Sequence, residues 1–350
     1  ADSAERFRTG VERAILARAG MLPAAERAAE AGSEFRGMTL LEIARASLSR
    51  AGASATGDKL AVVGRAFTHT TGDFSNLLAS TANKAMLKGW MEAPETFGAW
   101  TSTGSLPDFK ATSRVDIGAF PALSLIPEGA EYTYATLSDR GETAQIATYG
   151  KLFSITRQAI INDDLNAFTR IPASMARAAR RTVGNLVYAI LTGNPTMGDS
   201  VALFHANHSN LDTGGGSALS VTSLAAARVK MAKQTGQQAE PLNIQPAHLI
   251  VPVALRDAAA VILASEYNPD ATNKLQAPNP VRGMVDVIAD PRLDANSATA
   301  WYLTASPTAF DAIEVLYLDG NDAPFLDQQA GWNVDGTEFK VRIDAGVKAW

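Results

Sequence analysis

The sequence predicts an α+β protein in which a helical arm, an extended ribbon, one long helix and an α/β block follow one another. Three observations favour this class. Apolar residues recur at helical spacing within residues 1–106, residues 107–153 alternate as strands do, and short apolar strands alternate with a helix from Ala247 onward. No repeat with a period of roughly 20–50 residues is visible, which excludes a solenoid.

The composition excludes several classes of protein. The chain has 350 residues, of which 46% are apolar, so it can bury a sizeable core and is not disordered. A net charge of −5 argues against a dedicated nucleic-acid binder. The absence of cysteine excludes disulfides and thiolate metal sites. No apolar run reaches the roughly 18 residues of a transmembrane helix, so no membrane association is expected. The first residue, Ala1, is expected to reflect removal of an initiator Met.

The arm, residues 1–106, is predicted to consist of amphipathic helices. Thr39 and Glu42 form a capping box at the start of one helix, and Gly52 is placed to end it. Asp73 or Ser75 is expected to open a further helix. The apolar stripes of the first and last of these helices are Phe7, Val11, Ala14 and Ile15, and Leu77, Leu78, Met86, Leu87 and Trp90.

The ribbon, residues 107–153, has few bulky apolar side chains and is punctuated by Pro and Gly. A two-stranded ribbon of this kind is only marginally stable alone in water, and its unpaired edges need protection. We therefore expect its apolar surface to be buried against another copy of the chain. The residues predicted to make this contact are Phe120, Leu123, Leu125, Ile126, Tyr132 and Tyr134.

A long helix is predicted over 172–191, with Pro172 in its first turn. Its apolar side is predicted to contain Met175, Ala179, Val183, Leu186, Val187 and Ile190, and Arg177, Arg180 and Arg181 lie on another side. Thr222 is expected to open a second helix. The α/β block follows, and two long strands, "FDAIEVLYLD" and "TEFKVRIDAGVKAW", close the chain, joined by a loop over 319–336.

The sequence offers no convincing catalytic, cofactor-binding or metal-binding residues. His205 and His208 lie in a loop without a third ligand at suitable spacing, so we expect their rings to bind backbone groups. The segment 193–200 imitates a phosphate loop, but Asp199 stands where the lysine belongs. No nucleophile elbow is present. The alternative to a structural protein is a soluble α/β hydrolase that uses His205 or His208.

Several segments carry a resemblance to a known family. They include "NLLASTANKAMLKGWMEAPETF", "GSLPDFKATSRVDIGAFPALSLIPEGAEYTY", "ATYGKLFSITRQAIINDDL", "VYAILTGNPTM", "ALFHANHSNL" and "GWNVDGTEFKVRIDAGVKA". These segments, in this order, resemble the Hong Kong 97-type major capsid proteins of tailed bacteriophages, and more narrowly the Mu-like major head subunits.

The resemblance implies a domain organisation. Residues 1–106 would be the helical N-arm with its lead-in helix, and 107–153 the E-loop, which reaches over a neighbouring subunit. The P-domain, with its spine helix, would comprise 154–235 together with the closing strands and P-loop of 306–350. Residues 236–305 would form the A-domain around the capsomer axis.

The resemblance also implies a function. The chain would self-assemble into pentamers and hexamers of an icosahedral virion shell around double-stranded DNA that it contacts without sequence specificity. Decoration, portal, scaffold and head-protease proteins would be its partners, in the virion or in the host cytoplasm during assembly. Cleavage by a head protease would then be a second origin for Ala1.

In one respect the sequence departs from the founding member of this family, which cross-links its shell through an E-loop lysine. Residues 111–150 contain no lysine, and only Lys110 and Lys151 flank them. We therefore expect a shell that is held together without covalent bonds.

Overall fold

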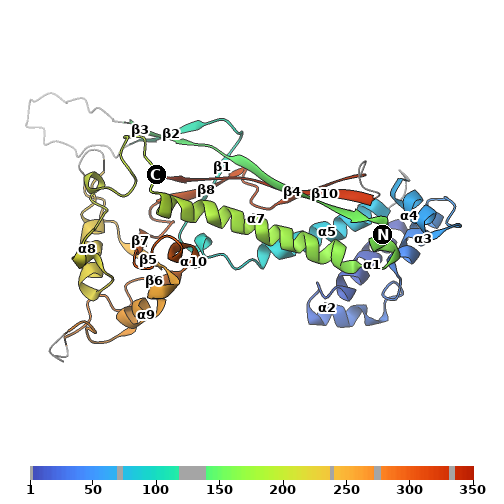
Figure 1. Ribbon diagram of the computed structural model, residues 1–350, viewed down its shortest axis with the longest axis horizontal. Coiled ribbons are helices and arrows are strands. Elements are labelled where there is room, and N and C mark those ends of the chain that lie inside the picture. The colour runs from blue at the N-terminus through green and yellow to red at the C-terminus, as the bar shows by residue number, and fades with distance from the viewer. Residues whose placement is uncertain (1–2, 69–73, 118–138, 237–239, 272–276, 331–335) are drawn as a thin grey trace, which may run out of the picture. The chain divides into compact units, whose positions relative to one another are not determined.

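The computed structural model describes residues 3–68, 74–117, 139–236, 240–271, 277–330 and 336–350. It divides into two compact units. Unit 1 contains residues 1–94, 148–182 and 322–344, and unit 2 contains 95–147, 183–321 and 345–350. Helices and sheets are both present in the predicted order, which confirms the α+β class (Figure 1).

Unit 1 is built around the helices of the N-terminal arm. These are α1 (Ser3–Arg18), α2 (Ala24–Ala29), α3 (Leu40–Arg50), α4 (Lys59–Thr68) and α5 (Phe74–Met91). The Thr39–Glu42 capping box and the left-handed Gly52 are both found where they were predicted. The predicted stripe of α1 is buried in one core with apolar residues of α3, α4 and α5, as is Phe168.

The long helix α7 spans Leu165–Gly193, and it follows the short helix α6 (Arg157–Ile161). The prediction that it begins at Pro172 was wrong by seven residues, because Pro172 lies inside the helix. Asp163 has a left-handed backbone, and the Asp164 side chain accepts a hydrogen bond from Asn166 N, which starts the helix earlier. Burial of Ala167 and Phe168 stabilises this first turn.

Close backbone contact in unit 1 explains a glycine in α5. A Cβ on Gly89 would lie 2.6 Å from Ala173 Cα of α7, closer than real Cβ atoms approach other atoms. The first part of α7 therefore packs on α5 through small residues.

The strands of unit 1 are β4 (Ala147–Thr156), β9 (Phe325–Ala330) and the first part of β10 (Gly336–Ala349). β9 pairs antiparallel with β10 in the register Thr337↔Ala330 to Arg342↔Phe325. The prediction that 319–336 is a loop was therefore wrong in part, because the segment contains the strand β9. The last residues of the predicted ribbon, 147–153, belong to β4, which lies next to β10 in the sheet.

Unit 2 contains three strand groups. β1 (Ser102–Leu106) pairs parallel with β8 (Ile313–Leu318), and β8 pairs antiparallel with the last part of β10. β2 (Thr112–Ile117) and β3 (Asp139–Ala144) form an antiparallel ribbon. In the α/β block, the order is β6-β5-β7, from Asp286–Ala289, Pro246–Val251 and Tyr302–Ala305.

Two helices pack with the α/β block, α8 (Val221–Ala232) and α9 (Arg256–Ala264), and the short α10 (Pro291–Asp294) follows β6. The N-cap of α8 is Ser220, which forms a capping box with Ser223, so the prediction that Thr222 opens this helix was wrong by two residues. None of the helices in the described ranges has the length and apolar character that crossing a membrane requires.

Candidate functional site at the base of the ribbon

The β2–β3 ribbon is the part of unit 2 that corresponds to the predicted inter-subunit arm. Its register runs from Thr112↔Ala144 to Ile117↔Asp139. The six predicted contact residues, Phe120, Leu123, Leu125, Ile126, Tyr132 and Tyr134, lie outside the described residues. The site that can be built from side chains is therefore the base of the ribbon, where β2 and β3 meet β8 and β10.

Four charged side chains form what we call the charge square. Arg114 of β2 stands opposite Glu142 of β3, and Glu314 of β8 stands opposite Lys348 of β10. Each ribbon charge then meets the opposite charge on the sheet. Arg114 Nη1 donates to Glu314 Oε2, and Lys348 Nζ lies 2.8 Å from Glu142 Oε2. The square carries no net charge, and it ties both strands of the ribbon to the sheet.

Both carboxylates of the charge square are buried and hydrogen-bonded. Glu314 is 6% exposed and Glu142 is 7% exposed. Trp350 Nε1 donates to Glu314 Oε2 at 2.9 Å, and Gly198 N donates to Glu142 Oε1 at 2.6 Å. The Arg114 guanidinium also lies 5.3 Å from the centre of the Trp350 ring. Buried charges are tolerated only when they are paired and hydrogen-bonded in this way.

Three glycines allow the backbones to approach one another at the same place. A Cβ on Gly104 would lie closer than 3.0 Å to the Glu314 side chain. A Cβ on Gly198 would lie 2.7 Å from Gly141 O, and one on Gly346 would overlap Gln145 O. Since two of these obstacles are backbone atoms, only glycine fits. The ribbon base is held by shape as well as by charge.

A small apolar cluster completes the ribbon base. Leu106, Ala144, Ile146 and Leu316 are each at most 2% exposed, and Leu318 and Trp350 pack against them. The cluster is much smaller than the cores of the helical arm and the α/β block. Apolar burial at this base is therefore modest, and the charge square adds the directional contacts that fix the orientation.

A second polar network anchors α10 to the last part of α7. Arg292 of α10 donates to Glu95 Oε2 at 2.9 Å, to Asp290 Oδ2 at 3.1 Å and to Asn185 Oδ1 at 2.7 Å. The guanidinium of this arginine lies over the ring of Tyr188 of α7, 5.4 Å from the ring centre. The network therefore fixes the start of α10, at the edge of the α/β block, to the long helix.

Tyr188 is the fully buried member of this network. Its hydroxyl lies 2.6 Å from Thr96 Oγ1, which in turn donates to Asp290 Oδ2 at 2.7 Å. Burial raises the pKa of the Tyr188 hydroxyl to about 12, and the negative charge of Asp290 acts in the same direction. Tyr188 therefore stays neutral at all ordinary pH values.

The predicted core residues of α7 divide into two groups. Val183 and Val187 are fully buried, whereas Met175, Leu186 and Ile190 are half-buried. The most buried apolar residues of the helix are Phe168, Ala173, Ala176, Val183, Val187, Tyr188 and Leu191. The buried face is thus rotated from the predicted one, because Tyr188 and the small residues face inward.

The two histidines of the 205–208 segment organise their own loop. His208 Nδ1 lies 2.9 Å from Leu203 O, and its Nε2 lies 2.7 Å from Asp199 Oδ2. The His205 ring accepts a hydrogen bond from Asn207 N. Among the described residues, no three His, Asp or Glu side chains gather as metal ligands would. These hydrogen bonds fix the conformation of the loop.

Comparison with known proteins places the chain in a family. Residues 141–350 match the model of a family described as phage capsid protein. No protein of curated function matches the sequence. Among solved structures, the bacteriophage JBD30 capsid has 16% identity and a TM-score of 0.49, and the match covers 57% of this chain and 91% of that one.

Two further solved structures show the same range of similarity. The capsid of Ralstonia phage GP4 has 11% identity and a TM-score of 0.46, over 71% of this chain and 81% of that one. The capsid of the cyanophage P-SCSP1u has 12% identity and a TM-score of 0.46, and the match covers 73% of this chain and 85% of that one.

The family match covers more than half of the chain, from β3 through α7, the α/β block and the closing strands. The hydrolase alternative has no support from this match or from the histidine loop. The chain therefore belongs to the phage capsid protein family, as a structural protein of the virion shell.

Proposed function

We propose that this protein forms the pentamers and hexamers of an icosahedral phage head, with the ribbon of one subunit lying over its neighbour. The observation that carries this proposal is the ribbon base. Two ion pairs with buried carboxylates hold β2 and β3 on the sheet, and Gly346 lets β10 approach the backbone of Gln145 next to β3. A ribbon that is fixed at its base, and whose two described strands form no apolar core by themselves, is suited to deliver its far end to another molecule.

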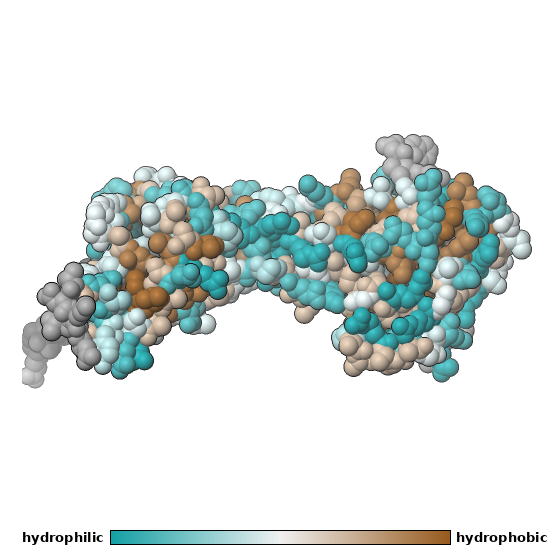
Figure 2. Space-filling model, turned by 60° about the horizontal axis from the view of Figure 1, so that its bottom comes forward, coloured by the Kyte–Doolittle hydropathy of each residue, from teal (hydrophilic) through white to brown (hydrophobic). Residues whose placement is uncertain are grey.

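Exposed apolar side chains support an assembled state. Leu152 is 69% exposed, Phe325 is 49% exposed and Val261 is 55% exposed. Unit 1 also has a pocket of about 450 Å³, lined by Ala79, Ser80, Asn83, Leu87, Pro324, Phe325 and Leu326. Figure 2 shows apolar residues, in brown, on the surface of both units. Surfaces of this kind are often covered when subunits associate.

The finer assignments follow from the resemblance described above. We assign 107–153 to the E-loop, 236–305 to the A-domain, and 154–235 with 306–350 to the P-domain of a Mu-like head subunit. The shell would enclose double-stranded DNA. Decoration, portal, scaffold and head-protease proteins are the partners that this role implies.

The test removes the apolar side chains of the arm while its length is kept. The variant F120S/L123S/L125S/I126S should fold as the parent does and should form no stable shells. Each large side chain is expected to contribute about 1.5–3 kcal/mol of burial on the neighbour. Circular dichroism and thermal melting report folding, and negative-stain microscopy reports assembly.

The matched control removes four other apolar side chains that are exposed in the subunit, Leu60, Leu211, Leu242 and Phe310. The variant L60S/L211S/L242S/F310S should still assemble. If the arm variant unfolds, the arm belongs to the subunit core. If the arm variant assembles as well as the control, the contacts that build the shell lie elsewhere.

We also propose that the shell is held together without covalent bonds. Formation of an isopeptide bond needs a lysine amine, and residues 111–150 have none. Shells boiled in detergent should therefore give one band near 36.9 kDa. A ladder of multimers would contradict this and would point to Lys110 or Lys151.

A further inference from the structure

The long helix α7 has a charge composition unlike that of the rest of the chain. Its 29 residues include four arginines and no Asp, Glu or Lys, although the chain as a whole carries a net charge of −5. An exposed helix usually mixes charges of both signs, because pairs three or four residues apart stabilise it. The uniform charge of α7 therefore calls for a partner outside the helix.

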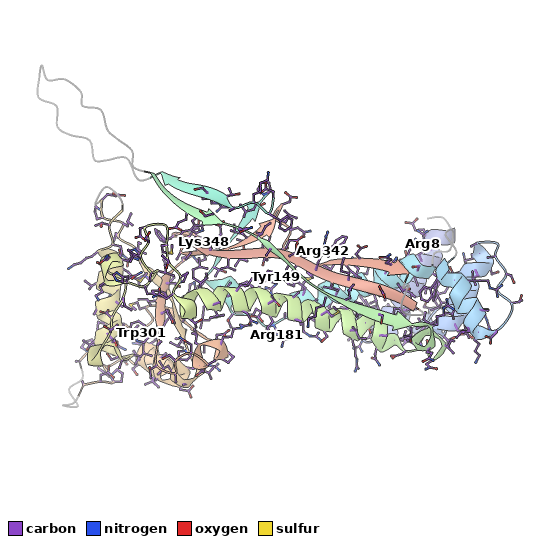
Figure 3. The ribbon with its side chains drawn as sticks, turned by 45° about the horizontal axis from the view of Figure 1, so that its top comes forward. Arg8, Tyr149, Arg181, Trp301, Arg342 and Lys348 are labelled. Atoms are coloured by element: carbon purple, nitrogen blue, oxygen red, sulfur yellow. The ribbon has the colours of Figure 1, made fainter. Side chains whose placement is uncertain are left out.

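Three of the four arginines lie on one exposed stripe. Arg170, Arg177 and Arg181 are separated by seven and four residues, which places them within about 40° of one another around the helix axis. All three are exposed, and in the described part of the chain none of them forms an ion pair. Figure 3 shows Arg181 on the side of α7 away from β4 and β10.

The fourth arginine shows the contrast. The Arg180 guanidinium lies 5.1 Å from the centre of the Trp90 ring, and Trp90 is 4% exposed. Arg180 therefore has a packing role inside unit 1, whereas the other three contact no aromatic ring among the described residues. The other exposed residues of α7 before its last turn carry no charge, and they are Asn166, Ile171, Ser174, Ala178, Asn185 and Ala189.

The dimensions of the stripe suit a nucleic-acid backbone. From Arg170 to Arg181 the helix rises about 16 Å, and duplex DNA presents one phosphate per about 1.7 Å of its axis. Each guanidinium can therefore reach a phosphate and bind two of its oxygens. Contacts to phosphates carry no sequence information, so binding through these arginines would show no sequence preference.

We infer that Arg170, Arg177 and Arg181 of α7 form a binding surface for the phosphates of double-stranded DNA. This inference rests on the proposed function, because it takes the DNA to be the content of the shell and places this face of α7 toward the interior. Three cations on an acidic subunit give a weak, salt-sensitive contact, which many copies together turn into an ordered layer.

The test compares two variants that remove the same number of positive charges. R170Q/R177Q/R181Q removes the stripe, and R6Q/R27Q/R256Q removes three other exposed arginines. Glutamine has a helix propensity close to that of arginine, so both variants should fold. Binding of unassembled subunits to a labelled 20-base-pair duplex is followed by fluorescence anisotropy at KCl concentrations from 50 to 200 mM.

The parent protein and the control variant should show the same dependence of log K on log salt. The stripe variant should have a slope smaller in magnitude by about 2–3, since each phosphate contact contributes about 0.9. Equal slopes for the two variants would overturn the inference. So would competition by polyglutamate that is as strong as competition by polyphosphate, because the surface would then fit an acidic protein segment.

Assembly is measured separately by microscopy. The stripe variant should form shells as the parent does, and its failure to do so would make the stripe a contact between subunits and would overturn the inference. If the parent itself forms no shells, the proposed function fails, while the salt dependence still decides whether the stripe binds DNA.

Discussion

Replacing Glu142 by Gln should release β3 from the sheet, because this change removes one corner of the charge square. Glu142 is 7% exposed, and its carboxylate contacts both Lys348 Nζ at 2.8 Å and Gly198 N at 2.6 Å. Two unit charges about 4 Å apart attract each other by about 4 kcal/mol at an effective dielectric constant of 20. Desolvation of both groups offsets much of this attraction.

The loss of stability in this variant should exceed the net stabilisation that the ion pair provides, because Lys348 is left without its carboxylate partner. Its side chain is 20% exposed, so water reaches it in part. Glu142→Gln should therefore lower the free energy of unfolding by about 3 kcal/mol, at the lower end of the range for breaking a buried pair. Lys348→Met should lower it by about 2 kcal/mol, because Glu142 keeps its hydrogen bond to Gly198.

A double-mutant cycle isolates the interaction. The double variant E142Q/K348M should be less destabilised than the sum of the single variants by about 1–2 kcal/mol. Urea unfolding followed by circular dichroism gives the free energies. Relative to the parent, Glu142→Gln should accelerate amide hydrogen exchange in Thr112–Ile117 and Asp139–Ala144. Exchange in Pro246–Val251, a strand of the α/β block, should stay unchanged.

The matched control is an exposed pair on β9 and β10. Lys340 Nζ lies 3.2 Å from Asp327 Oδ2, and the two side chains are 45% and 52% exposed. The cycle D327N/K340M should give a coupling of less than about 0.5 kcal/mol, as exposed pairs usually do. If the Glu142–Lys348 coupling is no larger than that of the control, the charge square does not hold the ribbon and this reasoning fails.

Three further predictions test the surroundings of this site. Val187→Asp should abolish folding, because it places an unpaired charge at a fully buried position, whereas Leu186→Asp at the half-buried neighbour should give a destabilised but folded subunit. Thermal melting distinguishes the two variants, and a more severe effect of Leu186→Asp would place the buried face of α7 where the sequence predicted it. Gly346→Ala should prevent the ribbon base from closing, while Gly98→Ala, with nothing within 4 Å, should be tolerated, as measured by limited proteolysis of the ribbon. Tyr188→Phe should reduce the loss of stability above pH 10. Because the pKa of Tyr188 is raised from 10.0 to about 12 in the folded state, the parent keeps the full stabilisation from this group below pH 10 and loses at most about 2.7 kcal/mol as the pH rises to about 12. Equal dependence of unfolding free energy on pH in parent and variant would contradict this.

Local signals in the sequence predicted local structure well. The Thr39–Glu42 capping box and Gly52 were predicted from neighbouring residues, and both are confirmed. The start of α7 was wrong because Pro172 was interpreted as a first-turn residue. A proline is also tolerated within a helix when the turns before it are stabilised by other contacts, here by the burial of Phe168.

The charge square could not be predicted, because it depends on two strand registers at once. Arg114 and Glu314 are 200 residues apart, and Glu142 and Lys348 belong to strands that pair with different partners. Opposite charges on polar strands are common and ordinarily face solvent. Only the pairing of β8 with β10, together with Arg114↔Glu142, shows that the charges alternate around a square.

The rigidity of the ribbon base has a direct consequence for assembly. The six residues of each described ribbon strand extend for about 20 Å. A rotation of about 10° at the base would move the far end of this segment by about 3–4 Å, which is enough to break side-chain contacts with a neighbour. The apolar contacts that we propose for the arm would therefore stabilise a shell only if the base holds its angle, because a loose arm must be ordered when it binds. Glu142→Gln should for this reason weaken assembly even in subunits that remain folded, although Glu142 itself is buried within its own subunit.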